Sequence, residues 1–181
     1  MGRIIRDAEL TTASGGTSAK ALVDTGAERT VVPYAKACEA GFAPRRALRD
    51  PQEATGAVPG ERLVGYRLPV TVTVVSDGGR RKEATVNAFV PRAVRTRNGK
   101  LRRLRPGEQP ESMTIGADFL QGARAQLKFR PTGRGRDRFD GVDAYGGLRV
   151  QPASPAVARA FKKLFANETC PVPRKKSRRR R

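Results

Sequence analysis

The sequence contains no histidine, and only two of its 181 residues are cysteine. The missing histidine excludes Ser-His-Asp and Cys-His nucleophile systems, histidine general bases and zinc sites of the HExxH type. Cys38 and Cys170 are too few for a four-cysteine zinc site, and they make a disulfide framework implausible. We therefore expect no metal and no cofactor. Two widely separated cysteines are typical of a reducing, intracellular compartment.

Long apolar runs are also missing. The first ten residues, MGRIIRDAEL, lack the apolar core of a secretory signal, and no stretch approaches the roughly 18 apolar residues that a membrane span needs. We expect a chain with no membrane span and a cytoplasmic location.

Basic residues are abundant, with 37 Lys and Arg against 17 Asp and Glu and a formal charge of +20. Such a charge attracts nucleic acid, anionic membrane or acidic proteins, and it bears on partners rather than on fold.

Short apolar runs separated by Gly, Pro, Asn and Asp predict a mainly β chain with a single domain. Strands are expected over 3–10, 21–24 and 30–32, and hairpins over 51–68 and 68–91. A short helix is expected after Pro33, another over about 118–122, and an amphipathic helix after the Ser154-Pro155 pair. Residues 91–112 read as an insertion loop or a protruding hairpin.

The stretch ALVDTGAERTVVP, residues 21–33, places the ionisable residue Asp24 at the end of an apolar strand. One interpretation is an Asx-turn, in which the carboxylate of Asp24 accepts backbone N–H groups at the bend. The other is a catalytic carboxylate. Asp, Thr and Gly are ordinary turn residues, so this stretch alone does not decide between the two.

A second block, TIGADFLQGARAQLKF at 114–129, follows a predicted hairpin with a Gly- and Pro-rich tip at 56–60. In this order the blocks resemble the two signature blocks of the retropepsins, the retroviral-type aspartic proteases, over roughly residues 2–129. The resemblance implies a single-lobe closed β-barrel with a short helix near the C-terminal end of its core. It also implies an aspartic endopeptidase.

Two carboxylates that share one proton can hydrolyse a peptide without histidine or metal, because one activates water while the other protonates the carbonyl. The chain has one Asp-Thr-Gly, so the resemblance implies a symmetric homodimer acting on a peptide or protein substrate. The catalytic residues it implies are Asp24, Thr25 and Gly26. The substrate-binding residues it implies are Ala27, Val32, Gly56, Val58, Gly60 and Ile115, although core packing is as good an interpretation of Val32 and Ile115.

Departures from the family pattern affect the dimer contacts. In retropepsins an Arg usually follows the Gly of the second block, and an acidic residue follows the Ala of the first block. In this chain Ala117 and Asp118 follow Gly116, and Arg29 follows Glu28. An exchanged pair of Arg29 and Asp118 is one interpretation, and an Asp118 that merely caps its helix is the other. The full set of expected dimer-bracing residues is Arg29, Asp118, Leu127 and Phe129.

The basic segments favour a rival function, a catalytically silent binding module that contacts nucleic acid or another polyanion. The expected polyanion-binding residues are Arg102, Arg103, Arg105, Arg178 and Arg179. A solvated tail is the plainer interpretation. The expected organisation is a protease domain at 1–130 with the insertion 91–112, an irregular Gly-rich extension at 131–153, an amphipathic helix at 154–169 and a disordered basic tail at 170–181.

Overall fold

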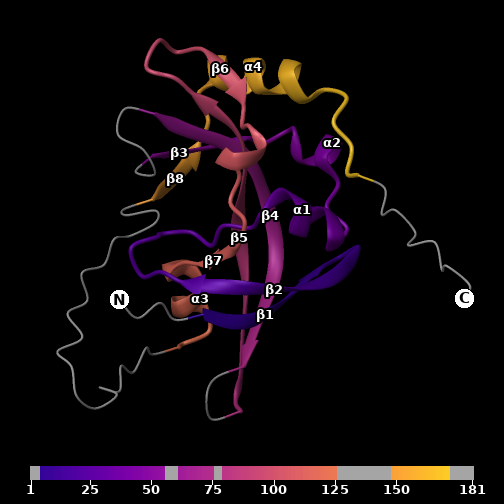
Figure 1. The fold of residues 1–181 in the computed structure, drawn as a ribbon, viewed down its shortest axis with the longest axis vertical. Coiled ribbons are helices and arrows are strands. Elements are labelled where there is room, and N and C mark those ends of the chain that lie inside the picture. The colour runs from indigo at the N-terminus through magenta and orange to yellow at the C-terminus, as the bar shows by residue number, and fades with distance from the viewer. Residues whose placement is uncertain (1–4, 56–60, 76–78, 126–147, 172–181) are drawn as a thin grey trace, which may run out of the picture.

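The computed structural model describes residues 5–55, 61–75, 79–125 and 148–171 (Figure 1). Its strands are β1 (Ile5–Thr12), β2 (Gly15–Val23), β3 (Gln52–Thr55), β4 (Arg62–Val75), β5 (Arg81–Arg95), β6 (Leu101–Arg103), β7 (Met113–Ile115) and β8 (Arg149–Pro152). Its helices are α1 (Tyr34–Glu39), α2 (Pro44–Ala47), the 3-10 turn η1 (Pro106–Glu108), α3 (Ala117–Gly122) and α4 (Pro155–Phe165).

The strands form one eight-stranded, largely antiparallel sheet, so the predicted mainly β character is confirmed. The order β6-β5-β4-β1-β2-β7 forms the main path, while β3 pairs with β4 and β8 pairs with β3. The β4–β5 hairpin runs nearly the whole length of the molecule (Figure 1). Alternating valines of β4, such as Val70 and Val72, are buried, which is the pattern of a strand with one covered face.

The sheet is not closed into a barrel, so the closed barrel implied by the resemblance is wrong. The stretch expected to form a strand at 30–32 contributes only single-residue bridges, from Val31 to Phe89 in β5 and from Val31 to Thr114 in β7. Pro33 follows at once and has no N–H to extend the ladder. The segment therefore touches both strands without pairing fully with either.

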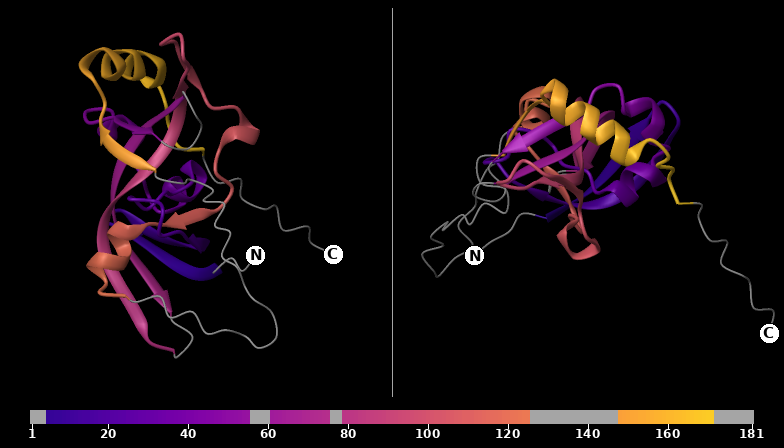
Figure 2. Two further views of the ribbon diagram at one scale, coloured as in Figure 1. Left: turned by 90° about the vertical axis from the view of Figure 1, so that its left-hand side faces the viewer. Right: turned by 90° about the horizontal axis from the view of Figure 1, so that it is seen from above.

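Helices α1, α3 and α4 form close to their predicted positions, whereas α2 and η1 were not predicted. Helix α1 ends before Gly41, whose φ of 83° favours glycine. The Ser154 hydroxyl accepts the N–H of Val157 at 3.5 Å and so caps α4, which buries Val157, Phe161 and Phe165. Helix α4 lies across the end of the molecule that also holds β6 (Figure 2). None of the described helices is long and apolar enough to cross a membrane.

A buried carboxylate fixes the segment after α4 to the sheet. Glu168 accepts hydrogen bonds from the Tyr66 hydroxyl at 2.6 Å, from Arg103 at 3.3 Å and from Arg92. The Arg92 guanidinium also lies over the ring of Tyr34, 3.9 Å from its centroid. Burial, followed by the charge of Glu168, raises the pKa of Tyr34 to about 12, and burial with the Glu168 hydrogen bond raises the pKa of Tyr66 as well.

A disulfide joins Cys38 in α1 to Cys170, which lies 132 residues later. The expectation of two unpaired cysteines is therefore wrong. Sequence distance concealed their proximity, because α4 returns the chain to α1 and places the two Cα atoms 5.4 Å apart. The cytoplasmic location stays a prediction and loses the support it drew from the cysteines, since disulfides persist mainly in oxidising compartments.

Replacing Glu168 by Gln should destabilise the fold strongly. The substitution keeps the side-chain shape but leaves the largely buried Arg92 without its counter-ion, which costs about 3 kcal/mol or more. Urea unfolding gives the free-energy change. Glu9→Gln is the matched control, because Glu9 pairs with Arg81 on the surface and should cost less than about 1 kcal/mol. Equal effects of the two variants would refute this account of Glu168.

Candidate functional site

Asp24 follows the last residue of β2, and its backbone extends the parallel pairing with β7. Its N–H donates to the Ile115 carbonyl at 3.0 Å. The side chain is only 8% exposed, and its Oδ1 accepts the N–H of Gly26 at 2.9 Å, which is the Asx-turn bond. Oδ2 is buried and has no hydrogen-bond partner among the residues that the structure describes. The turn therefore uses one carboxylate oxygen and leaves the other without a partner.

The turn after Asp24 is fastened to the start of α3. The carbonyl of Ala27 accepts the N–H of Ala117 at 2.8 Å, and that of Glu28 accepts the N–H of Asp118 at 3.2 Å. Val31 and Thr114 then exchange two backbone hydrogen bonds, at 2.8 and 2.9 Å. The two sequence blocks that carry the resemblance are thus in direct contact along their backbones.

Asp118 is held by the first block. Its Oδ1 accepts the N–H of Thr30 at 2.9 Å, the Thr30 hydroxyl at 2.8 Å and the N–H of Phe119 at 2.8 Å. The Thr30 hydroxyl in turn accepts the N–H of Gly116 at 3.3 Å. These contacts all lie within one chain and bond Asp118 to Thr30. The pairing of Asp118 with Arg29 across a dimer stays a prediction.

Gly116 lies where the two blocks cross at closest range. A Cβ atom at this position would lie 2.5 Å from the Arg29 carbonyl carbon and 2.8 Å from the Thr30 nitrogen, which are both backbone atoms. Gly116 itself has a φ of −92°, so the need for glycine comes from space and not from backbone conformation.

Gly116→Ala should therefore destabilise the protein, because the added methyl group forces the two backbones apart. We expect a cost of at least about 2 kcal/mol, as for other overpacked sites, measured by urea unfolding. Gly107→Ala is the control, since a Cβ there meets nothing within 4 Å. A Gly116→Ala protein as stable as Gly107→Ala would contradict the close crossing.

Some of the remaining expected site residues are described by the structure, and the others are not. Thr25 is exposed and Gly26 is half-buried, whereas Ala27, Val32 and Ile115 are buried. Val32 and Ile115 belong to the main core, which favours the core-packing interpretation of both. Gly56, Val58, Gly60, Leu127, Phe129, Arg178 and Arg179 lie outside the described residues.

A second, smaller apolar cluster surrounds Ala27. Its buried members are Ala27, Val31, Ala54, Phe89 and Leu148. Sequence reasoning selected Val32 as a substrate-binding residue and missed Val31. Neighbouring side chains of an extended chain point to opposite sides, so only one of the two can belong to this cluster. Nothing in the sequence pointed to Leu148, which lies over a hundred positions from Ala27.

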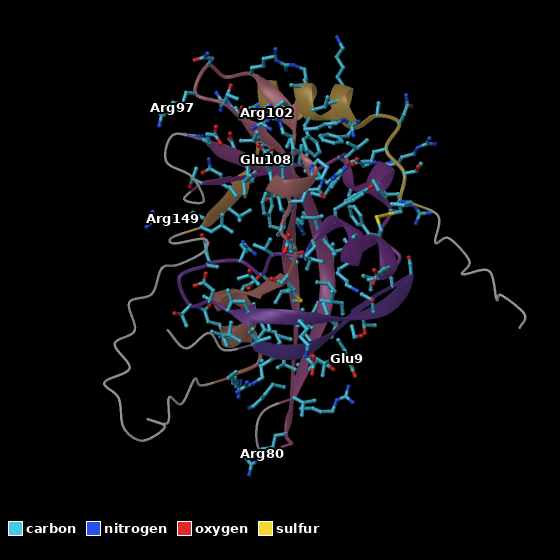
Figure 3. All side chains as sticks on the ribbon, viewed as in Figure 1. Glu9, Arg80, Arg97, Arg102, Glu108 and Arg149 are labelled. Carbon is cyan, nitrogen blue, oxygen red and sulfur yellow. A yellow bond between two sulfur atoms is a disulfide. The ribbon has the colours of Figure 1, made fainter. Side chains whose placement is uncertain are left out.

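The basic insertion is a hairpin, as one of its two interpretations predicted: β5 continues to Arg95, and Arg95 pairs with Leu101 in β6. Arg102 donates two hydrogen bonds to Glu108, at 2.6 and 2.8 Å, and Figure 3 shows the two side chains at the same end of the molecule. Arg103 bonds to Glu168 and lies over the Phe165 ring. Arg102 and Arg103 are therefore engaged by carboxylates of their own chain, while Arg105 is exposed.

Glu108 should keep its charge well into acid. The hydrogen bonds from Arg102, followed by the one from the Arg105 N–H, lower the pKa of Glu108 from the ordinary 4.5 to about 2. A lowered pKa in the folded state means that the contact contributes above pH 4.5 and is lost as the pH falls through about 2.

Carbon NMR of the Glu108 carboxyl group should give this low midpoint in the wild type. Arg102→Gln should move the midpoint up towards 4.5. An unchanged midpoint in the variant would show that Arg102 does not hold the carboxylate.

Two other features bear on the chemistry. A surface depression of about 600 Å³ is lined by residues including Asp7, Ser18 and Lys36, and not by Asp24. The described part of the chain holds no group of three or more Cys, Asp or Glu residues placed to bind a metal ion.

Comparison with known proteins does not assign the chain to a family. No protein-family model matches the chain, and no curated protein matches it.

Proposed function

We propose that the chain is an aspartic endopeptidase that acts as a symmetric homodimer, with one Asp24 from each copy. The observation that carries the proposal is Oδ2 of Asp24, a buried carboxylate oxygen without a hydrogen-bond partner among the described residues; Oδ2 of Asp118, in the adjoining block, is in the same state. Leaving such an atom unpaired costs about 1–3 kcal/mol, so its retention calls for an explanation. A second Asp24 that shares a proton with it provides one.

The geometry around Asp24 supports a distinct role for each oxygen. Oδ1 is held by the Gly26 N–H, which fixes the plane of the carboxylate. We assign Oδ2 to the shared proton, the water and the substrate carbonyl. Because this atom is buried in the single chain, the groups that cover it must move before a second copy or a substrate reaches it. Two carboxylates about 3 Å apart cannot both ionise, so one takes a proton from water while the other donates to the carbonyl oxygen.

The proposed dimer follows from the number of Asp-Thr-Gly motifs in the chain. One chain supplies one Asp-Thr-Gly, and a two-fold axis brings the same residue of a second copy to meet it. The side chain of Thr25 is exposed in the single chain and is thus accessible to a partner copy. Arg29, half-buried beside the turn, is also accessible for the proposed pairing with Asp118 of the other copy.

The rival function, a silent polyanion-binding module, has weaker support from the described residues. Arg102 and Arg103 are two of the seven basic residues of the insertion at 91–112, and both are paired with glutamates. Adding nucleic acid at low and high salt to the cleavage assay tests what remains of this alternative, because phosphate contacts weaken steeply with salt.

The test compares wild type with Asp24→Asn on a mixed peptide library from about pH 4 to 7, with cleavage read by mass spectrometry. Wild type should cleave and Asp24→Asn should not. The Asn side chain keeps the shape and the Gly26 contact, so the loss reports on the carboxylate. Cleavage by both proteins, or by neither, would refute the proposal.

Mixing the two proteins tests the dimer. If Asp24→Asn chains exchange freely into dimers, an equal amount added to wild type should lower cleavage to about half, because mixed dimers hold one carboxylate. Unchanged cleavage in the mixture would mean that a single chain suffices.

A further inference from the structure

A short segment from the C-terminal part of the chain returns to the Asp24 turn. The carbonyl of Leu148 accepts the N–H of Glu28 at 3.0 Å, four positions after Asp24. The next four residues form β8, which lies within 131–153, a stretch predicted to be irregular. Residues 148–152 therefore contact the turn that bears Asp24 directly.

The same segment also contacts the hairpin of β3 and β4, whose tip at 56–60 includes residues that the resemblance assigns to substrate binding. Strand β8 pairs antiparallel with β3, and its register sets Arg149 opposite Thr55 and Pro152 opposite Gln52. Strand β3 thus lies between β4 on one side and β8 on the other. Figure 1 shows β3 and β8 side by side. The segment spans from the turn to the hairpin, as an extended peptide between them would.

Leu148 is the main side-chain contact of this segment. It is fully buried in the small cluster with Ala27, Val31, Ala54 and Phe89, which is separate from the main core. Three of these residues come from the Asp24 turn and from β3, the two elements that the segment joins. The Leu148 side chain packs among them, and we call the space that it fills the pocket at Ala27.

We propose that Leu148–Pro152 occupies, within its own chain, the groove that takes a substrate peptide, with Leu148 in the pocket at Ala27. This rests on the proposed function and adds to it a substrate class: extended peptides that carry an aliphatic side chain of leucine size at this position. Recognition of a strand by main-chain bonds to a sheet edge and by one side-chain pocket is a recurring mode of peptide binding.

Displacing the segment breaks its pairing with β3 and exposes Leu148, but it removes no residue from the main core. Beyond Leu148, only Val150 packs against the cluster, whereas Arg149, Gln151 and Pro152 are exposed. Its C-terminal end is fixed separately, because the Ala153 N–H donates to the Pro51 carbonyl and α4 follows directly. A tethered segment has a high effective concentration, so it competes with every incoming peptide.

The test measures peptide binding in an Asp24→Asn background, where cleavage plays no part. The probe is acetyl-Leu-Arg-Val-Gln-Pro carrying a fluorescent label, followed by anisotropy. Leu148→Ser should raise its affinity at least about tenfold, because the competing leucine is removed from the pocket. A probe with Ser in place of Leu should bind the same variant at least about tenfold more weakly.

Val75→Ser in the same background is the matched control. It also removes an apolar side chain, but Val75 is 49% exposed and lies outside the cluster, so probe affinity should stay at the Asp24→Asn level. Circular dichroism checks that Leu148→Ser is folded. If it is not, Leu148→Ala makes a smaller change at the same position and should raise affinity in the same direction.

The outcomes separate this inference from the proposed function. Equal probe affinity with and without the Leu148 substitution, or equal binding of the Leu and Ser probes, overturns the inference even if wild type cleaves peptides. Tighter probe binding by the Leu148 variant, together with no cleavage by wild type and none by Leu148→Ser carrying the intact Asp24, upholds the groove and refutes the endopeptidase.

Discussion

The crossing of Gly116 over the Arg29–Thr30 backbone is the constraint on which the site depends. The two segments lie so close that a Cβ atom does not fit, and Thr30 binds Gly116 and Asp118 from the same position. With α3 fastened there, the Asp24 turn has one position relative to β7. A turn of small residues would otherwise have many conformations, and burying a carboxylate demands that one of them be selected.

Contacts elsewhere in the chain fix the segment that follows α4. The Glu168 cluster and the Cys38–Cys170 disulfide attach the segment after α4 to α1 and to the long hairpin. Both lie downstream of β8, so they fix the C-terminal end of the segment at 148–152 while its contacts with the turn stay few. The anchoring beyond the segment rests on the disulfide and the Glu168 contacts, whereas the segment itself is held by its pairing with β3 and by the buried Leu148.

Sequence reasoning predicted the elements whose causes are local. Alternating valines revealed the long hairpin, and the Ser154-Pro155 pair revealed the start of α4, because period and capping act within a few residues. It failed where contacts join distant residues: the disulfide, the place of Leu148 and the choice between Val31 and Val32. The open sheet is a further case, because whether a segment makes a full strand or one bridge depends on neighbours that the local pattern does not contain.

The unpartnered oxygen of Asp24 and the buried side chain of Leu148 both bear on how the proposed site becomes active. A carboxylate oxygen without a partner among the described residues favours a site completed from outside the chain, and a leucine packed against Ala27 of the same turn favours a groove already filled from within. Under the proposed function, cleavage has two separate requirements. A second copy must supply the second Asp24, and the substrate must displace Leu148. Activity then depends on both protein concentration and peptide affinity, whereas the fold, fixed at Gly116 and Glu168, need not change for either.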